Sequence, residues 1–165
     1  LTLDGSLVWS SAFGGVGTDI GKAVVGTGDG RFLLAGYTDS YGTYDHSTQR
    51  ITYHAYLVAF DLDGDTLWTR TLGDTLFDTH LYAMQRMASG DLYLAGERGT
   101  SALSDAVLYR TSPTGAPAWQ RVLDLGKEER LTNLCILSNG ILATGWSFGE
   151  FSRQVLFIRR DTNGN

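Results

Sequence analysis

Basic side chains are few in this sequence, with 13 Lys and Arg against 18 Asp and Glu and a formal net charge of −5. Nucleic acids and anionic membrane surfaces both require a basic patch, so neither is expected as a partner. No apolar run approaches the length of a membrane span, and no charged start followed by an apolar stretch marks a signal peptide. The sequence therefore predicts neither nucleic-acid binding nor membrane insertion.

Cysteine and proline are also scarce. The single cysteine, Cys135, excludes a disulfide within the chain, and its apolar surroundings LTNLCIL predict a small buried hydrophobic side chain. Two prolines stand against 21 glycines, with 42% hydrophobic and 12% aromatic residues. This composition is typical of a folded β protein rich in turns, and 165 residues suffice for one domain with a sizeable core.

The glycine-rich stretch GGVGTDIGKA at 14–23 is similar to a phosphate-binding loop but lacks two of its fixed residues. Val16 stands where the first glycine is required, and Ala23 stands where Ser or Thr would bind Mg²⁺. We therefore expect a turn between two strands here, and no nucleotide.

Three tryptophan strands, three glycine hairpins and three apolar strands recur in the same order along the chain. The tryptophans are Trp9, Trp68 and Trp119. The glycines fall into two sets, Gly30, Gly90 and Gly140, and Gly36, Gly96 and Gly145. The period is roughly 50 residues, which is typical of repeat architectures. We predict repeats over about 14–72, 73–123 and 124–165 in a single domain spanning 1–165.

Each repeat reads as four short strands. In the first, aromatic and aliphatic runs bounded by turn residues predict strands at 22–27, 31–38, 55–61 and 65–72. Asp29-Gly30 and the later Asn139-Gly140 are strong hairpin signals. No segment of ten or more residues has a helical period, so we expect about twelve strands and no long helix.

Four antiparallel strands per repeat predict an all-β fold, a segment of a β-propeller with about three four-stranded antiparallel blades. One twisted sheet has two apolar faces, which radial packing of blades buries. A β-sandwich is the alternative, but it gives no reason for tryptophans and glycines to recur at matched positions. We therefore favour the propeller.

At these residues the chain resembles the bacterial β-propeller repeats of the PQQ-like and secreted seven-bladed types. The stretch AFDLDGDTLWTRTLG at 59–73 is similar to the turn and tryptophan strand of those repeats, and TGDGRFLLAGYTDS at 27–40 is similar to their hairpin. The resemblance implies an extracellular, cell-surface or periplasmic location. The third tryptophan strand departs from the pattern, with Ala116-Pro117-Ala118 before Trp119. Three repeats are too few for a quinone site, so we expect no cofactor.

The chain begins and ends at the same phase of the repeat. We expect 6–13 to be the outermost strand of a neighbouring blade, and Gly164 to precede another such strand. Two explanations stay open, since a ring needs about four to eight blades. The chain is either part of a larger propeller or one of several copies that close a ring by self-association.

The segment 38–54 is the longest loop that we expect on one face of the ring, which predicts a function or an insertion. Its side chains suit a protein or a carbohydrate ligand, and His80 is expected on the same face. The candidate ligand-binding residues are Tyr41, Tyr44, Asp45, His46, Arg50, Tyr53, His54 and His80.

Metal and catalytic motifs are incomplete. Asp61, Asp63 and Asp65 start like a calcium loop, but Thr66 and Leu72 stand where glycine and glutamate are required. The three histidines lack the spacing of a zinc site, so no metal is expected.

No Gly-x-Ser-x-Gly occurs, and Cys135 has no histidine nearby in the sequence. A carboxylate pair that converges from different blades stays open, because nothing in the sequence selects one. We expect a non-catalytic binding or scaffold module. The alternatives are a purely structural spacer and a fragment of a propeller enzyme (quinoprotein, lyase or hydrolase) that needs further blades.

Overall fold

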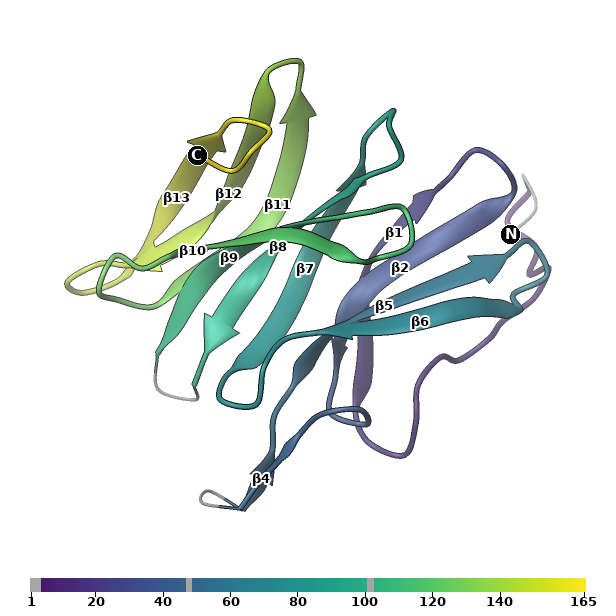
Figure 1. The fold of residues 1–165 in the computed structure, drawn as a ribbon, viewed down its shortest axis with the longest axis horizontal. Coiled ribbons are helices and arrows are strands. Elements are labelled where there is room, and N and C mark those ends of the chain that lie inside the picture. The colour runs from purple at the N-terminus through teal and green to yellow at the C-terminus, as the bar shows by residue number, and fades with distance from the viewer. Residues whose placement is uncertain (1–3, 47–48, 101–102) are drawn as a thin grey trace.

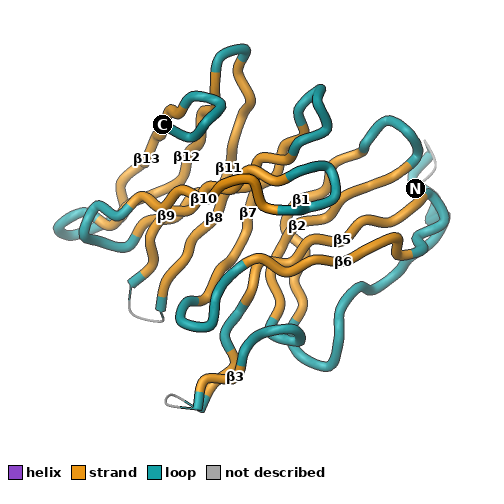
Figure 2. The backbone as a smooth tube through the Cα atoms, viewed as in Figure 1, coloured by secondary structure: helices purple, strands orange, loops and turns teal. Residues whose placement is uncertain are grey.

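The computed structural model describes residues 4–46, 49–100 and 103–165, and this part of the chain forms strands, turns and loops without a helix (Figure 2). The first sheet has the strand order β1-β2-β5-β6, with β1 (Asp19–Gly26), β2 (Arg31–Thr38), β5 (His54–Asp61) and β6 (Thr66–Leu72). A separate pair, β3 (Tyr44–Asp45) and β4 (Arg50–Ile51), forms a small hairpin between β2 and β5.

The next two sheets repeat this order. The second consists of β7 (Asp78–Arg86), β8 (Leu92–Gly99), β9 (Ser104–Thr111) and β10 (Pro117–Leu123). The third consists of β11 (Glu129–Leu137), β12 (Gly140–Phe148) and β13 (Arg153–Arg160). All neighbouring strands within each sheet are antiparallel.

The first strands of the three sheets lie next to one another, since β7 contacts both β1 and β11 (Figure 1). The three sheets therefore stand side by side around this inner row of strands, as blades do around a propeller axis. The prediction of an all-β propeller segment is confirmed. We call the sheets blade 1, blade 2 and blade 3 in chain order.

The strands predicted for blade 1 are confirmed to within three residues at each end. Residues 6–13, expected as the outermost strand of a neighbouring blade, form no strand in the structure. Backbone groups of a strand need a partner strand, and the described residues include no other strand of such a neighbouring blade, so this expectation stays a prediction. Blade 3 accordingly has three strands, not four.

Two apolar cores lie between the blades. Leu33 and Leu57 of blade 1 pack with Leu81 and Leu94 of blade 2. The other face of blade 2 packs against blade 3 through a second cluster that contains Tyr93, Leu108, Leu131 and Ile141. Each fully buried leucine of this kind stabilises the fold by roughly 1.5–3 kcal/mol, so these cores hold adjacent blades together.

The glycines of the second strands permit a bulge in each inner strand. Regular pairing of the inner strands is interrupted at Lys22, Tyr82 and Thr132, one extra residue per blade. A Cβ at Gly36, Gly96 or Gly145 would overlap a carbonyl oxygen of the inner strand, two residues before the bulge residue. Only glycine leaves room for that carbonyl, which explains why the position repeats.

The repeated tryptophans pack against turns of the blade that follows. A Cβ at Gly115 in blade 2 would lie 3.2 Å from Trp68, and one at Gly164 in blade 3 would lie 3.0 Å from Trp119. Trp9 has the same relation to blade 1, at 3.1 Å from a Cβ at Gly64. Its Nε1 also donates a hydrogen bond to the Leu62 carbonyl at 2.6 Å. The three tryptophans therefore occupy equivalent positions.

The turns beneath these tryptophans share one hydrogen-bond pattern. In the first, the Asp61 carboxylate accepts from the backbone N–H groups of Asp63 and Asp65, at 3.0 and 2.9 Å. Asp161 accepts in the same way from Asn163 and Asn165, both at 2.9 Å. Asp61 thus closes a tight turn, as expected from its incomplete calcium-loop spacing.

The third glycine of the hairpin set behaves differently from the other two. Gly30 and Gly90 have φ angles of 84° and 94°, which favour glycine. Gly140 pairs with Leu137 inside the ladder and is not among the positive-φ residues. The hairpin at this position is as predicted, but its loop is Ser138-Asn139, so Asn139-Gly140 is not its central pair.

Candidate functional site

The segments that enter the inner strands and leave the second strands lie at one end of the blades, because neighbouring strands are antiparallel. Three of them, 14–18, 73–77 and 124–128, precede the inner strands, and three others, 39–53, 100–103 and 149–152, follow the second strands. We call this end the loop face. It lies toward the lower side in Figure 1, where the β3–β4 hairpin projects.

Glu97, near the end of β8, is the centre of a polar network on the loop face. Its carboxylate accepts hydrogen bonds from the Arg130 guanidinium at 2.6 and 2.8 Å, the Tyr82 hydroxyl at 2.6 Å and the Ser104 hydroxyl at 3.1 Å. His80 Nδ1 lies 3.2 Å from the same carboxylate. Glu97 is buried and joins two blades, since Arg130 belongs to blade 3.

This network fixes the charge of Glu97. Burial alone would raise the pKa of its carboxyl group, but hydrogen bonds from His80, Arg130 and Tyr82 outweigh burial and hold the pKa at about 2. Burial and the hydrogen bond to Glu97 raise the pKa of Tyr82 well above its usual value. Glu97 is therefore an anion near neutral pH that orients its neighbours, and it is poorly suited to act as a general acid or base there.

Cationic and aromatic side chains alternate across all three blades beside Glu97. The Lys22 ammonium lies 5.7 Å from the centre of the Tyr37 ring and 5.9 Å from that of Tyr82. The Arg130 guanidinium lies 4.9 Å from the Tyr82 ring and 5.2 Å from the Trp146 ring. Arg153 covers Trp146 at 4.1 Å. Contacts at these distances are attractive and hold the rings in place.

A pocket of about 200 Å³ opens beside this row. It is lined by Asp78, His80, Glu97, Gly99, Thr100, Ser104, Glu128 and Arg130. A second hollow of about 540 Å³ adjoins it at Glu128 and is lined by the apolar side chains Leu103 and Phe148, among others. The polar pocket and its flanking aromatic rings have the composition of a site for a small polar ligand.

The structure brings three of the predicted residues to this pocket. Arg50 of the β3–β4 hairpin forms an ion pair with the Asp78 carboxylate, which also accepts the Tyr53 backbone N–H at 2.9 Å. The rings of Tyr53 and His80 lie 5.2 Å apart, and Tyr37 lies 4.3 Å from His80. Asp78 thus anchors the hairpin to the edge of the pocket.

The other predicted residues lie elsewhere. The rings of Tyr44 and His46 meet edge to face, with centroids 5.0 Å apart, in the exposed hairpin, which also carries Asp45. Tyr41 packs on Tyr56 at 5.5 Å, and His54 Nε2 lies 3.3 Å from the Thr52 hydroxyl. The predicted set is therefore divided between the pocket edge, the projecting hairpin, the turn after β2 that holds Tyr41, and the first residue of β5.

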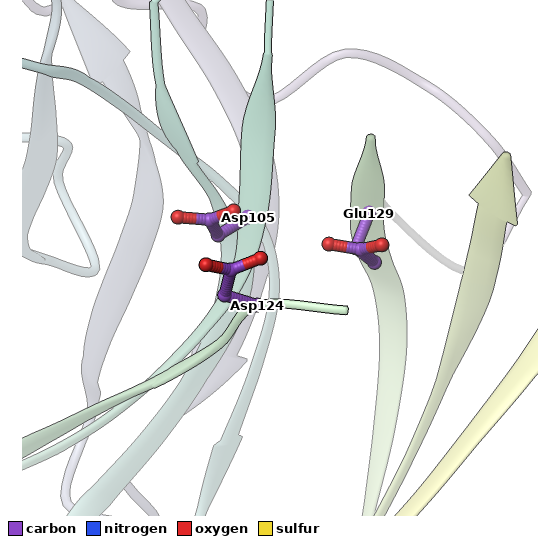
Figure 3. Close-up of side chains that lie close together, drawn as sticks. All are labelled: Asp105, Asp124 and Glu129. Atoms are coloured by element: carbon purple, nitrogen blue, oxygen red, sulfur yellow. The ribbon is translucent and has the colours of Figure 1, made fainter. Parts of the chain in front are cut away.

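Three carboxyl groups converge between blades 2 and 3, on Asp105, Asp124 and Glu129 (Figure 3). Their oxygen atoms lie within 4.8 Å of one another, a donor set that could hold a divalent cation. Burial, followed by the charges of neighbouring carboxylates, raises the pKa of Asp105 and of Glu129. Leu125 N–H and the Ser147 hydroxyl donate to Glu129 at 3.4 and 3.3 Å, so the buried carboxylate has protein partners.

Sequence reasoning missed most of the pocket residues, yet a signal for them exists. The residues that follow the three repeated glycines are Tyr37, Glu97 and Trp146. A second repeat position holds Ile20, His80 and Arg130, and a third holds the bulge residues Lys22, Tyr82 and Thr132. These positions vary in chemistry although their backbone repeats. When the residue type changes between blades at a position whose backbone repeats, core packing does not determine that side chain.

Within the described residues, no helix has the length and apolarity that a membrane span requires. Comparison with protein-family models gives no match, and neither does comparison with curated proteins.

Proposed function

We propose that this chain is a non-catalytic binding module built from bacterial-type propeller repeats, and that it recognises a carbohydrate at the pocket around Glu97. The observation that carries the proposal is the set of partly exposed aromatic rings, Tyr37, Tyr53, Tyr82 and Trp146, placed beside polar groups that Glu97 holds in fixed orientations. A sugar ring presents apolar C–H faces, which pack on aromatic rings, and hydroxyl groups, which pair with fixed donors and acceptors.

The hydrogen-bond donors of Arg130 support this proposal. A guanidinium has five N–H donors, and Glu97 engages only its Nε and one terminal nitrogen. The remaining donors, with Lys22 and His80 nearby, are available to hydroxyl or carboxylate oxygens of a ligand. Because Glu97 already fixes the guanidinium, the Arg130 side chain loses little further conformational entropy when a ligand binds.

A non-catalytic role agrees with the electrostatics of the pocket. Its central carboxylate is held as an anion with a pKa of about 2, whereas hydrolytic enzymes raise the pKa of the carboxyl group that donates a proton. An exported or cell-surface location forms part of the proposal, because it suits a module that binds carbohydrate and follows from the repeat resemblance.

A panel of neutral and acidic oligosaccharides tests the proposal by titration calorimetry. We expect Lys22→Ala and Trp146→Phe to weaken binding of a positive glycan about fivefold to thirtyfold, since each contact contributes roughly 1–2 kcal/mol. Lys22 is exposed, so its removal leaves the core intact.

The matched control is the double variant Tyr44→Ala, His46→Ala in the projecting hairpin, which should bind as the wild type does. Loss of binding in this variant alone would move the site to the hairpin and overturn the assignment to the pocket. Absence of any binding across the panel would overturn the carbohydrate proposal.

A further inference from the structure

The distal face of blade 3, which points away from blade 2, leaves apolar side chains uncovered. Val155 is 73% exposed and Phe157 is 67% exposed. Val155 and Phe157 pair with the two residues that flank the repeated glycine of β12. In blade 2, Ala106 and Leu108 pair with the two residues that flank the repeated glycine of β8, so they are the equivalent residues. Those residues are 1% and 3% exposed, because blade 3 covers them. Val155 and Phe157 therefore have the positions of interface residues without a neighbouring blade.

Cys135 lies on the same uncovered face. The prediction of a buried thiol was wrong, since Cys135 is exposed. Its pairing with Leu142 makes it the equivalent of Val25 in blade 1, which pairs with Leu33. Val25 is partly buried against the core between blades 1 and 2, whereas Gln85, the equivalent in blade 2, stays exposed beside blade 3. Cys135 therefore lies at the margin of the position that a next blade would occupy.

Blade 1 has the complementary face. Trp9 and Phe13 already cover its outer part around Phe60, which is 6% exposed. Its inner part is open, since Val24 is 60% exposed, whereas the equivalents Met84 and Leu134, in blades 2 and 3, are 5% and 3% exposed. Each of those two is covered by the blade that precedes it. The chain therefore carries one copy of each half of the interface that it uses twice internally.

The N-terminal segment shows where a preceding blade would lie. Trp68 and Trp119 belong to the outermost strands β6 and β10, and each packs on the next blade. Trp9 has the equivalent position on blade 1, and Phe13 stacks on Phe60 at 5.0 Å. Residues 6–13 thus follow the path of an outermost strand, although they have no strand conformation in the structure.

Blade 3 offers a strand for residues 6–13 to pair with. Within the described residues, β13 is the last strand of its sheet, and its outer edge has no strand partner. The turn at 161–165 also matches the turns that precede β6 and β10, including the backbone hydrogen bond from Asp161 N to the Asn165 carbonyl at 3.0 Å. An unpaired strand edge beside an uncovered apolar face is a template for another chain.

We propose that a second copy of this chain covers these surfaces. Blade 3 of one copy packs against blade 1 of the other, and residues 6–13 of the second copy pair with β13 of the first as its fourth strand. The contact is head to tail, and it occurs twice in a closed pair. Two copies supply six blades, which lies within the range of about four to eight blades in closed propellers.

The single cysteine allows a direct test. Val25 and Met84 belong to the same core between blades 1 and 2. Across the proposed contact, Cys135 of one copy takes the place of Val25, and Val24 of the other copy takes the place of Met84. We expect Val24→Cys to crosslink to Cys135 of the second copy with a short bismaleimide, giving a covalent dimer on a denaturing gel. The control, Leu76→Cys, places an equally accessible thiol in the loop between β6 and β7, away from both faces.

Light scattering after size exclusion gives the second measurement. We expect the mass of two chains for the wild type at tens of micromolar, and of one chain for Phe157→Asp. Phe157 is exposed within the chain, so this variant should keep the circular dichroism of the wild type. A monomeric wild type would overturn the proposal, because it would leave these faces to other blades. A dimer that survives Phe157→Asp, or equal crosslinking in Leu76→Cys, would overturn it too.

Discussion

Glu97 illustrates how one side chain serves both stability and the pocket. Its carboxylate accepts hydrogen bonds from side chains of three strands, β7 and β9 of blade 2 and β11 of blade 3. It therefore ties blade 2 to blade 3 at the loop face. A buried carboxylate is costly unless it is paired, and here each oxygen accepts at least two hydrogen bonds. The same bonds orient Arg130 and Tyr82 toward the pocket.

Glu97→Gln should lower the free energy of unfolding by roughly 2–4 kcal/mol at pH 7, because Arg130 then lacks its anionic partner. The folded-state pKa of Glu97 is about 2, below the usual value of 4.5 for a glutamate. Its contribution is therefore present above about pH 4.5 and is lost as the pH falls toward 2. Urea denaturation of both proteins should show a difference that shrinks over this range. Glu150→Gln, at an exposed position, should show none.

In the cluster of Asp105, Asp124 and Glu129, ionisation has the opposite effect on the stability of the folded chain. Burial and neighbouring charge raise the pKa of Asp105 and of Glu129, so their ionisation destabilises the folded chain as the pH rises. Asp124→Asn should therefore stabilise the protein at pH 7 by up to about 1 kcal/mol. The gain should vanish at acidic pH, where the carboxyl groups are protonated. Thermal unfolding at pH 7 and pH 4 measures it, and a loss of stability at pH 7 would contradict it.

At the scale of elements, the bulges in the inner strands connect the repeat to the pocket. A bulge adds one residue and redirects its side chain. Lys22 and Tyr82 are such residues, and both belong to the row of cations and rings on the loop face. The repeated glycine opposite each bulge is therefore a requirement of this row of side chains as well as of the fold.

Gly96→Ala should destabilise the chain by about 3 kcal/mol or more, because its Cβ would overlap the His80 carbonyl oxygen in a close-packed sheet. Displacement of the bulge should also weaken ligand binding. The matched control is Gly26→Ala at the end of β1, where the nearest atom to a Cβ lies 4.0 Å away on Phe32. Chemical denaturation should find this control within about 0.5 kcal/mol of the wild type.

The sequence predicted these elements well and the site only in part. Strands and hairpins follow from local apolar runs and turn residues, which β2 and β5 show clearly. The bulges have no local signature, since Lys22, Tyr82 and Thr132 share no chemistry. Glu97 was missed because its partners Arg130 and His80 are distant in the sequence. The loop 38–54 stood out by length, but length does not show which of its residues face the pocket.

At the scale of the whole molecule, the proposed pairing of blade 3 with blade 1 of a second copy would link stability to concentration. Association that requires the folded state stabilises it by mass action. If two copies close a ring, a tenfold increase in protein concentration should raise the midpoint of thermal unfolding of the wild type. The midpoint of Phe157→Asp should stay constant over the same range. A wild-type midpoint independent of concentration from about 1 to 100 µM would contradict the proposed pair.

The position of the tryptophans has a consequence for how the molecule unfolds. Trp68 and Trp119 are hydrogen-bonded into the ladder of one blade while their rings cover a turn of the next. No blade can therefore lose its order without uncovering part of its neighbour. In a linear array with such strong nearest-neighbour coupling, the repeats behave as one cooperative unit and not as independent ones. Heating should consequently melt the three blades in a single calorimetric transition, although each has its own sheet.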